Sequence, residues 1–129
     1  MKLTGEPWAV SELRHAEMFL IRHAPVAERG RLAGRLDLPA DLSNQAGFSA
    51  LAARLPEGAM LTSSPARRCL MTAEALMPGL VVRTNERLWE QDFGAHEGLS
   101  PADLPDLGQM TRAKLATLAP PGGESFADM

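Results

Sequence analysis

Residues 19–25 read Phe-Leu-Ile-Arg-His-Ala-Pro, an apolar run that ends in a pair of adjacent basic side chains. Short apolar runs of this kind are typical of buried parallel strands, so we predict a strand over residues 17–22 that stops at His23. In open α/β sheets, the side chains that follow the carboxyl ends of the strands line the ligand crevice. Arg22 and His23 are therefore candidate site residues.

The segments that follow alternate between helix and strand signals. Apolar side chains share one helical face over residues 43–55, and a second helix is predicted over residues 65–77 with Ser64 as its N-cap. Short apolar runs at residues 59–64 and 80–83 predict two further strands. This alternation predicts an α/β fold with right-handed crossovers between mostly parallel strands.

The remainder of the chain carries weaker signals. Residues 86–101 are rich in charge and aromatic rings but have no clear period, which predicts an ordered loop. A short helix is predicted to open at Ser100-Pro101, another over residues 110–118, and Ser125 is a candidate cap for one more.

Composition limits the classes of function. A chain of 129 residues, 45% of them hydrophobic, fits one domain with a core of its own. Its formal net charge of -3 argues against broad nucleic-acid binding. Cys69 is the only cysteine, so the simplest expectation is a reducing, cytoplasmic location. Neither a secretory signal nor a membrane span is expected, because charged residues and proline interrupt the apolar runs near the start and no apolar run is long enough to cross a membrane.

Several side chains could together transfer a phosphoryl group. A histidine such as His23 can attack phosphorus and form a covalent intermediate, while guanidinium groups match phosphate oxygens. Arg22, with Arg67 or Arg68, would supply the guanidinium groups, and Glu90 could give the leaving group its proton. Taken singly, each has an ordinary structural explanation: a hydrogen-bonded histidine, solvated arginines and a surface carboxylate.

The order of five sequence blocks favours the chemical interpretation. The blocks are LIRHA (20–24), GRLAGRLDLPADLS (30–43), SSPARRCLMTA (63–73), LWEQDFGAHEG (88–98) and PPGGES (120–125). Together they resemble the motifs of the histidine phosphatase superfamily, the phosphoglycerate mutase-like enzymes. Ala24 stands where that family usually has glycine, and GRLAGRLDLP resembles the matching stretch of α-ribazole phosphatases.

This resemblance implies a three-layer α/β/α fold and a phosphomonoester hydrolase. His23 would be the nucleophile that becomes phosphohistidine, and Glu90 would be the proton donor. Arg22, Arg68 and Arg35 would bind the substrate, the first two as clamps on the phosphoryl group. The family implies no metal or organic cofactor, a small phosphorylated substrate, and no nucleic-acid or membrane partner; a homodimer is left open.

One family feature is not found in the sequence. Family enzymes carry a second catalytic histidine after a late strand that lies beside the first, and nothing after Glu90 matches it. His15 and His96 are poor substitutes, because the first precedes the domain and the second lies within a loop block. We therefore expect residues 1–17 to be an extension or a misassigned start. Residues 18–129 would be the N-terminal two-thirds of the domain, lacking its C-terminal strand or strands.

Three functions remain open at this level. A phosphatase acting on a small metabolite is favoured over a protein phosphohistidine phosphatase, because the second block points to a small substrate. The third alternative is a catalytically impaired fragment, or a phosphate-binding remnant, that lacks the second histidine.

Overall fold

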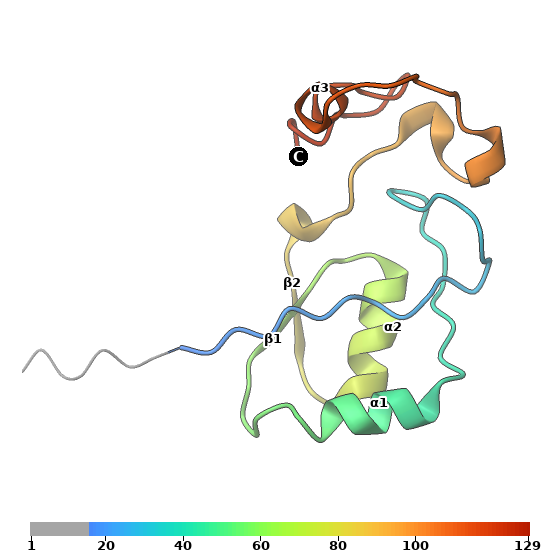
Figure 1. Cartoon of the computed structure of the whole chain (residues 1–129). Helices are drawn as coiled ribbons and strands as arrows, with labels where there is room; N and C mark the ends of the chain where they lie inside the picture. Colours follow the sequence, from blue (N-terminus) through green and yellow to red (C-terminus); the bar gives the residue numbers. More distant parts are fainter. Residues whose placement is uncertain (1–15) are drawn as a thin grey trace, which may run out of the picture.

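Two parallel strands form the sheet in the part of the chain that the structure describes. The structure is a computed structural model, and it describes residues 16–129. Strand β1 (Leu61–Ser63) pairs in parallel with β2 (Val82–Thr84), and α2 (Arg67–Leu76) connects them (Figure 1). The predicted α/β class with parallel strands is therefore confirmed. His15 and most of the expected N-terminal extension lie outside the described residues.

Helix α1 (Gln45–Ala52) precedes the sheet and packs against α2. Its N-cap is Asn44, whose side-chain oxygen accepts a hydrogen bond from the Gly47 N–H at 3.0 Å. The predicted cap at Ser43 is one residue too early, because Asn44 satisfies the free N–H groups of the first turn.

Helix α2 begins two residues later than predicted, at Arg67, and the residue before it makes no side-chain cap. The cap comes instead from a distant loop, where the Asp37 carboxylate accepts a hydrogen bond from the Arg67 N–H at 2.6 Å. Ser64 bonds the Ala66 N–H before the helix starts. A carboxylate at the amino end of a helix is stabilised by the helix dipole, so Asp37 fixes where α2 begins.

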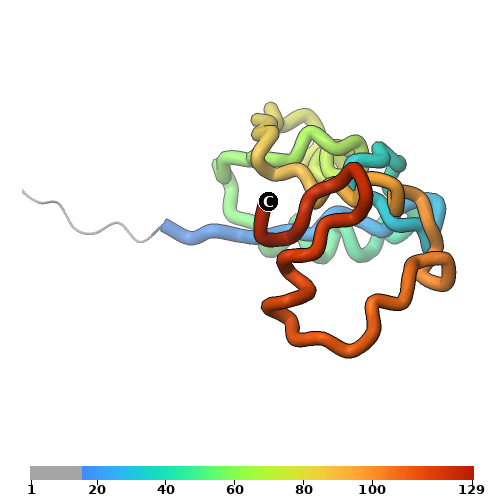
Figure 2. Tube along the Cα trace, turned by 90° about the horizontal axis from the view of Figure 1, so that it is seen from above, coloured from blue at the N-terminus to red at the C-terminus, as the bar shows by residue number. Residues whose placement is uncertain are grey.

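The strand predicted over residues 17–22 is not formed. This segment is extended but pairs with no other described strand, and Figure 1 draws it without a strand arrow; Figure 2 shows it running across the molecule from the N-terminal side. A cavity of about 490 Å³ lies between residues 19–23 and β1. Met18 and Leu20 are 83% and 89% exposed. A strand needs a neighbour within roughly 5 Å to satisfy its backbone, and here the neighbouring space is empty of described residues.

The C-terminal part of the chain is mostly loop. It contains the short 3₁₀ helices η1 (Glu86–Leu88), η2 (Gly94–His96) and η3 (Pro101–Asp103), and helix α3 (Arg112–Ala116). Helices η3 and α3 confirm the two short helices predicted at Ser100-Pro101 and over residues 110–118. At Ser125 a turn forms instead of a helix, closed by hydrogen bonds of its N–H and hydroxyl to the Asp128 carboxylate at 3.0 and 2.6 Å.

The interior is small and includes a charged side chain. Its buried apolar residues belong to α2, its N-cap and the loop before α1: Leu38, Ala40, Ala66, Ala73 and Leu76. Arg68, on α2, is 2% exposed and is the largest fully buried side chain described. No described helix is both long enough and apolar enough to cross a membrane.

Candidate active site

His23 lies at the end of the extended segment, and the contacts of its two ring nitrogens indicate its tautomer. The ring atom Nδ1 lies 2.6 Å from the carbonyl oxygen of Ala24, and Nε2 lies 3.3 Å from Nε of Arg68. A carbonyl only accepts and a guanidinium only donates, so Nδ1 carries the proton and Nε2 presents its lone pair. This is the tautomer in which Nε2 can act as a nucleophile.

Arg68 holds its charge beside that lone pair. Besides Nε, its two terminal nitrogens donate to the carbonyl oxygens of Gly34 at 3.0 Å and Leu36 at 3.4 Å. Among the described residues, no carboxylate lies within ion-pair distance of the guanidinium. A buried positive charge with only neutral partners attracts an anion strongly, because the surrounding dielectric is low.

Thr72 connects helix α2 to Ala24, the residue after His23. Its hydroxyl donates to the Arg68 carbonyl at 2.8 Å and accepts from the Ala24 N–H at 2.9 Å. Thr72 is therefore a positioning residue for His23. Thr72 lies within the third sequence block, residues 63–73, but the sequence alone assigned it no role. Its spacing of four residues from Arg68, which puts both on one helix face, was the available signal.

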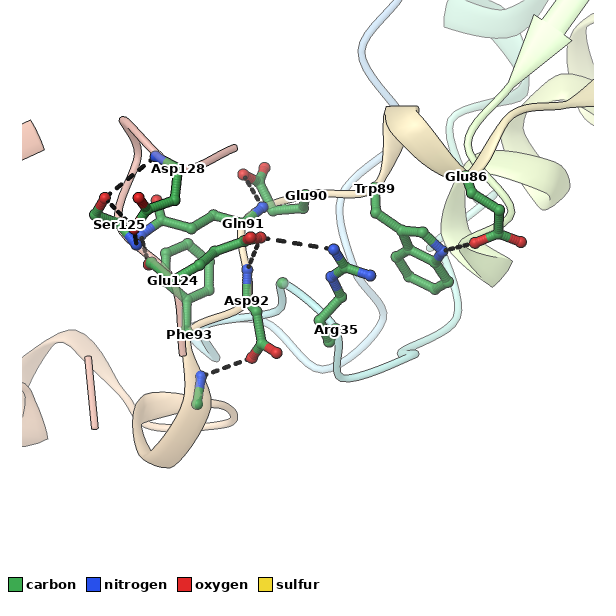
Figure 3. A network of polar contacts seen from close by, with 12 residues as sticks. Arg35, Glu86, Trp89, Glu90, Gln91, Asp92, Phe93, Glu124, Ser125 and Asp128 are labelled. Carbon is green, nitrogen blue, oxygen red and sulfur yellow. Dashed lines mark hydrogen bonds and ion pairs between the residues drawn. The ribbon is translucent and has the colours of Figure 1, made fainter. Parts of the chain in front are cut away.

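A cavity of about 520 Å³ opens next to His23. Arg22 and Glu90 share its lining with His23, so the structure brings three of the predicted site residues together. The others come from the loop after His23 and from the segment after Glu90: Pro25, Val26, Arg29, Gly30, Arg31, Leu32, Ala33 and Phe93. Glu90 Oε1 accepts the N–H of the next residue, Gln91, at 3.0 Å (Figure 3).

Two other residues weighed from the sequence lie elsewhere. Arg35 contacts Glu124, with 3.6 Å between Nη2 and Oε1, and its guanidinium lies 5.4 Å from the centre of the Trp89 ring (Figure 3). It does not line the cavity beside His23, and its role in substrate binding stays a prediction. His96 lines a separate, largely apolar cavity of about 790 Å³ near α3.

Glu97 fixes the loop that passes behind the site. Its carboxylate accepts four backbone N–H groups, from Gly34, Arg35, Leu36 and Phe93, at 2.7 to 3.1 Å. Partial burial alone would raise the pKa of this carboxyl, but the four N–H groups outweigh burial and hold it below its ordinary value. The sequence alone assigned Glu97 no role, because three of its four partners come from one distant segment, residues 34–36.

Only glycine fits at position 34. A Cβ atom there would lie 2.0 Å from the Gln91 carbonyl oxygen and 2.7 Å from Oε1 of Glu97. The glycine lets the loop approach Glu97 closely, and it leaves the Gly34 carbonyl directed at Arg68.

Replacing Glu97 by glutamine is expected to lower the free energy of unfolding by about 2 kcal/mol near neutral pH, because hydrogen bonds to a charged acceptor are lost. Since the pKa of Glu97 is lowered by folding, this stabilisation is present above the ordinary pKa of a glutamate and disappears as the pH falls through the lowered folded pKa. Urea denaturation of both proteins across acid pH should show the difference shrinking. The exposed Glu57→Gln is the control, and an equal, pH-independent effect of both changes would contradict the prediction.

No group of three or more histidine, cysteine, aspartate or glutamate side chains within residues 16–129 is placed to hold a metal ion. The described groups beside His23 are instead suited to an anion, because guanidinium groups predominate there.

Comparison with protein families identifies this arrangement. The model of the histidine phosphatase superfamily, branch 1, matches residues 18–129. The chain belongs to that superfamily. Histidine phosphatase superfamily membership accounts for the order of the five sequence blocks.

Three solved structures illustrate the likeness. TTHB049 from Thermus thermophilus is 32% identical with a TM-score of 0.68, over 84% of this chain and 63% of that one. Mycobacterial hydrolase 1 is 32% identical with a TM-score of 0.64, over 82% of this chain and 55% of that one. A mycobacterial glucosyl-3-phosphoglycerate phosphatase is 33% identical with a TM-score of 0.57, over 80% and 53%. This chain thus spans less than two-thirds of their length. No curated protein matches the sequence significantly.

Proposed function

We propose that the protein hydrolyses phosphomonoesters through a phosphohistidine on His23, with a small phosphorylated metabolite as its substrate. The observation that carries the proposal is the tautomer of His23, whose Nδ1–H is committed to a carbonyl while Nε2 faces the buried charge of Arg68. Membership of the superfamily and the likeness to a glucosyl-3-phosphoglycerate phosphatase support the same reaction.

The reaction proceeds in two displacements. In the first, Nε2 of His23 attacks phosphorus, the bond to the ester oxygen breaks, and Glu90 gives its proton to that oxygen. In the second, Glu90 takes a proton from water as the water oxygen attacks phosphohistidine, which releases inorganic phosphate and restores Nε2. Arg22 and Arg68 stabilise the charge on the phosphoryl oxygens in both steps.

The size of the cavity favours a small substrate. About 520 Å³ lies within the range of small-molecule sites, and the cavity is lined by residues of two separate segments, 22–33 and 90–93. A protein phosphohistidine phosphatase needs a surface that admits a folded partner, so it is the second choice. A phosphate-binding remnant would keep Arg22 and Arg68 without turnover.

Trapping the intermediate tests the proposal. The whole chain is incubated with 4-nitrophenyl phosphate labelled with ³²P and quenched in alkali, which preserves phosphohistidine. We expect steady hydrolysis and a labelled protein, and a loss of both by at least about 10³-fold in His23→Ala. His96→Ala is the matched control, because His96 lines a different cavity. Phosphate binding without label or turnover would reject the enzyme and leave the remnant.

A further inference from the structure

Two arginines outside the predicted site line the cavity beside His23. Arg29 and Arg31 lie on the loop that follows His23, and together with Arg22 they are three arginines among the lining residues of the cavity. Glu90 is the single carboxylate among its lining residues. The cavity therefore carries more positive charge than one phosphoryl group needs, since Arg68 also stands behind His23.

The loop that carries these arginines is fixed by backbone hydrogen bonds. The Leu32 N–H donates to the Leu99 carbonyl at 2.9 Å, and the Gly98 N–H donates to the Leu32 carbonyl at 2.8 Å. On the other side, the Ala27 N–H donates to the Pro39 carbonyl at 2.9 Å. The backbone at both ends of the pair is thus held, so binding an anion there costs mainly side-chain entropy.

The carboxylates that now pair with Arg29 and Arg31 would compete only weakly with a bound anion. Nη2 of Arg29 lies 3.3 Å from Asp41, and Nε of Arg31 lies 3.4 Å from Glu28. The arginine side chains are 77% and 53% exposed, and exposed ion pairs contribute at most about 1 kcal/mol. Asp41 has another donor in the Ser43 N–H at 3.0 Å, so it does not depend on Arg29.

We propose that Arg29 and Arg31 form a second anion site in the catalytic cavity, and that the preferred substrate carries a second anionic group, a carboxylate or a phosphate, on its leaving group. The proposal rests on the proposed function for its first anion, the phosphoryl group at His23. Guanidinium groups bind either oxyanion bidentately, and their arrangement on a held loop aligns the leaving group with Glu90.

Three substrates that differ in one substituent test the second site. Phenyl phosphate has a neutral leaving group, 4-carboxyphenyl phosphate adds a carboxylate, and 1,4-phenylene bisphosphate adds a second phosphate. For the unmodified protein we expect kcat/KM to be about tenfold or more higher for at least one of the two substrates with an added anionic group than for phenyl phosphate. Arg29→Gln/Arg31→Gln should bring that ratio close to one, because each guanidinium pairs with the added anion.

The ratio of kcat/KM values separates an effect on substrate recognition from an effect on folding, because misfolding lowers kcat/KM for all three substrates together. Arg54→Gln, an exposed arginine outside this cavity, is the matched control and should keep the full ratio. The dissociation constants of the same compounds, followed by tryptophan fluorescence, repeat the comparison without turnover. If the protein binds but does not hydrolyse them, the proposed function fails while the second site is still tested. A ratio unchanged in the double variant overturns the second site.

Discussion

Replacing Arg68 by methionine is expected to lower kcat/KM for 4-nitrophenyl phosphate by about 10³-fold, because a preorganised charge at the reacting centre is usually the largest catalytic contribution. The same change leaves the Gly34 and Leu36 carbonyls and the Nε2 of His23 without the donor they now share. We therefore also expect a loss of about 3 kcal/mol in unfolding free energy. Initial rates and urea denaturation measure the two effects.

Two neighbouring changes separate charge from geometry. Arg67→Met alters an exposed side chain one position earlier on α2 and should change stability by less than about 0.5 kcal/mol. Arg68→Lys keeps the charge but cannot serve three acceptors in the plane of a guanidinium, so its rate should stay at least about 10²-fold below normal. A folded Arg68→Met protein with a rate within tenfold of normal would show that Arg68 is structural only.

The effect of Glu90→Gln is expected to depend on the leaving group. With glycerol 2-phosphate, whose alkoxide must be protonated as it leaves, we expect kcat to fall by about 10² to 10³-fold. With 4-nitrophenyl phosphate the leaving phenolate is stable without a proton, and the fall should be much smaller. Rates for a series of aryl and alkyl phosphates measure this dependence.

Glu86→Gln is the control for the Glu90→Gln experiment. Glu86 is an exposed carboxylate whose Oε2 accepts the indole N–H of Trp89 at 2.9 Å (Figure 3). It does not line the cavity beside His23. Its replacement should leave the dependence on the leaving group unchanged. An equal loss for both substrate types in Glu90→Gln would mean that Glu90 acts on phosphate binding, and its role as proton donor would be discarded.

Elements with a local cause could be predicted from the sequence. Helices α1 and α2 and strands β1 and β2 lie within a few residues of their predicted places, because periodicity and stop signals lie inside each segment. The start of α2 was misplaced because its cap, Asp37, comes from a segment far away in the chain. The strand over residues 17–22 was wrong for a similar reason, since a strand depends on a partner elsewhere in the chain.

The candidate site divides in the same way. Arg22, His23 and Glu90 could be predicted, because each sits in a recognisable motif, and the structure brings them to one cavity. Thr72 and Glu97 act through hydrogen bonds to backbone groups of distant segments, and no local pattern indicates such partners. Arg29 and Arg31 read as solvated loop charges until the fold places them beside His23.

The extended segment before His23, residues 17–22, pairs with no described strand, and this has a consequence for the entropy cost of positioning His23. Residues 17–22 make no backbone hydrogen bond to another described residue, and the first backbone hydrogen bond after them is donated by the Ala24 N–H to the Thr72 hydroxyl. Fixing the backbone of one residue costs about 1 to 2 kcal/mol, and no backbone hydrogen bond to another described residue offsets that cost in this segment. Any extended peptide that enters the adjacent space and orders these residues would narrow the range of positions of His23. If His23 acts as proposed, the ordering of this segment and the turnover rate should therefore rise together.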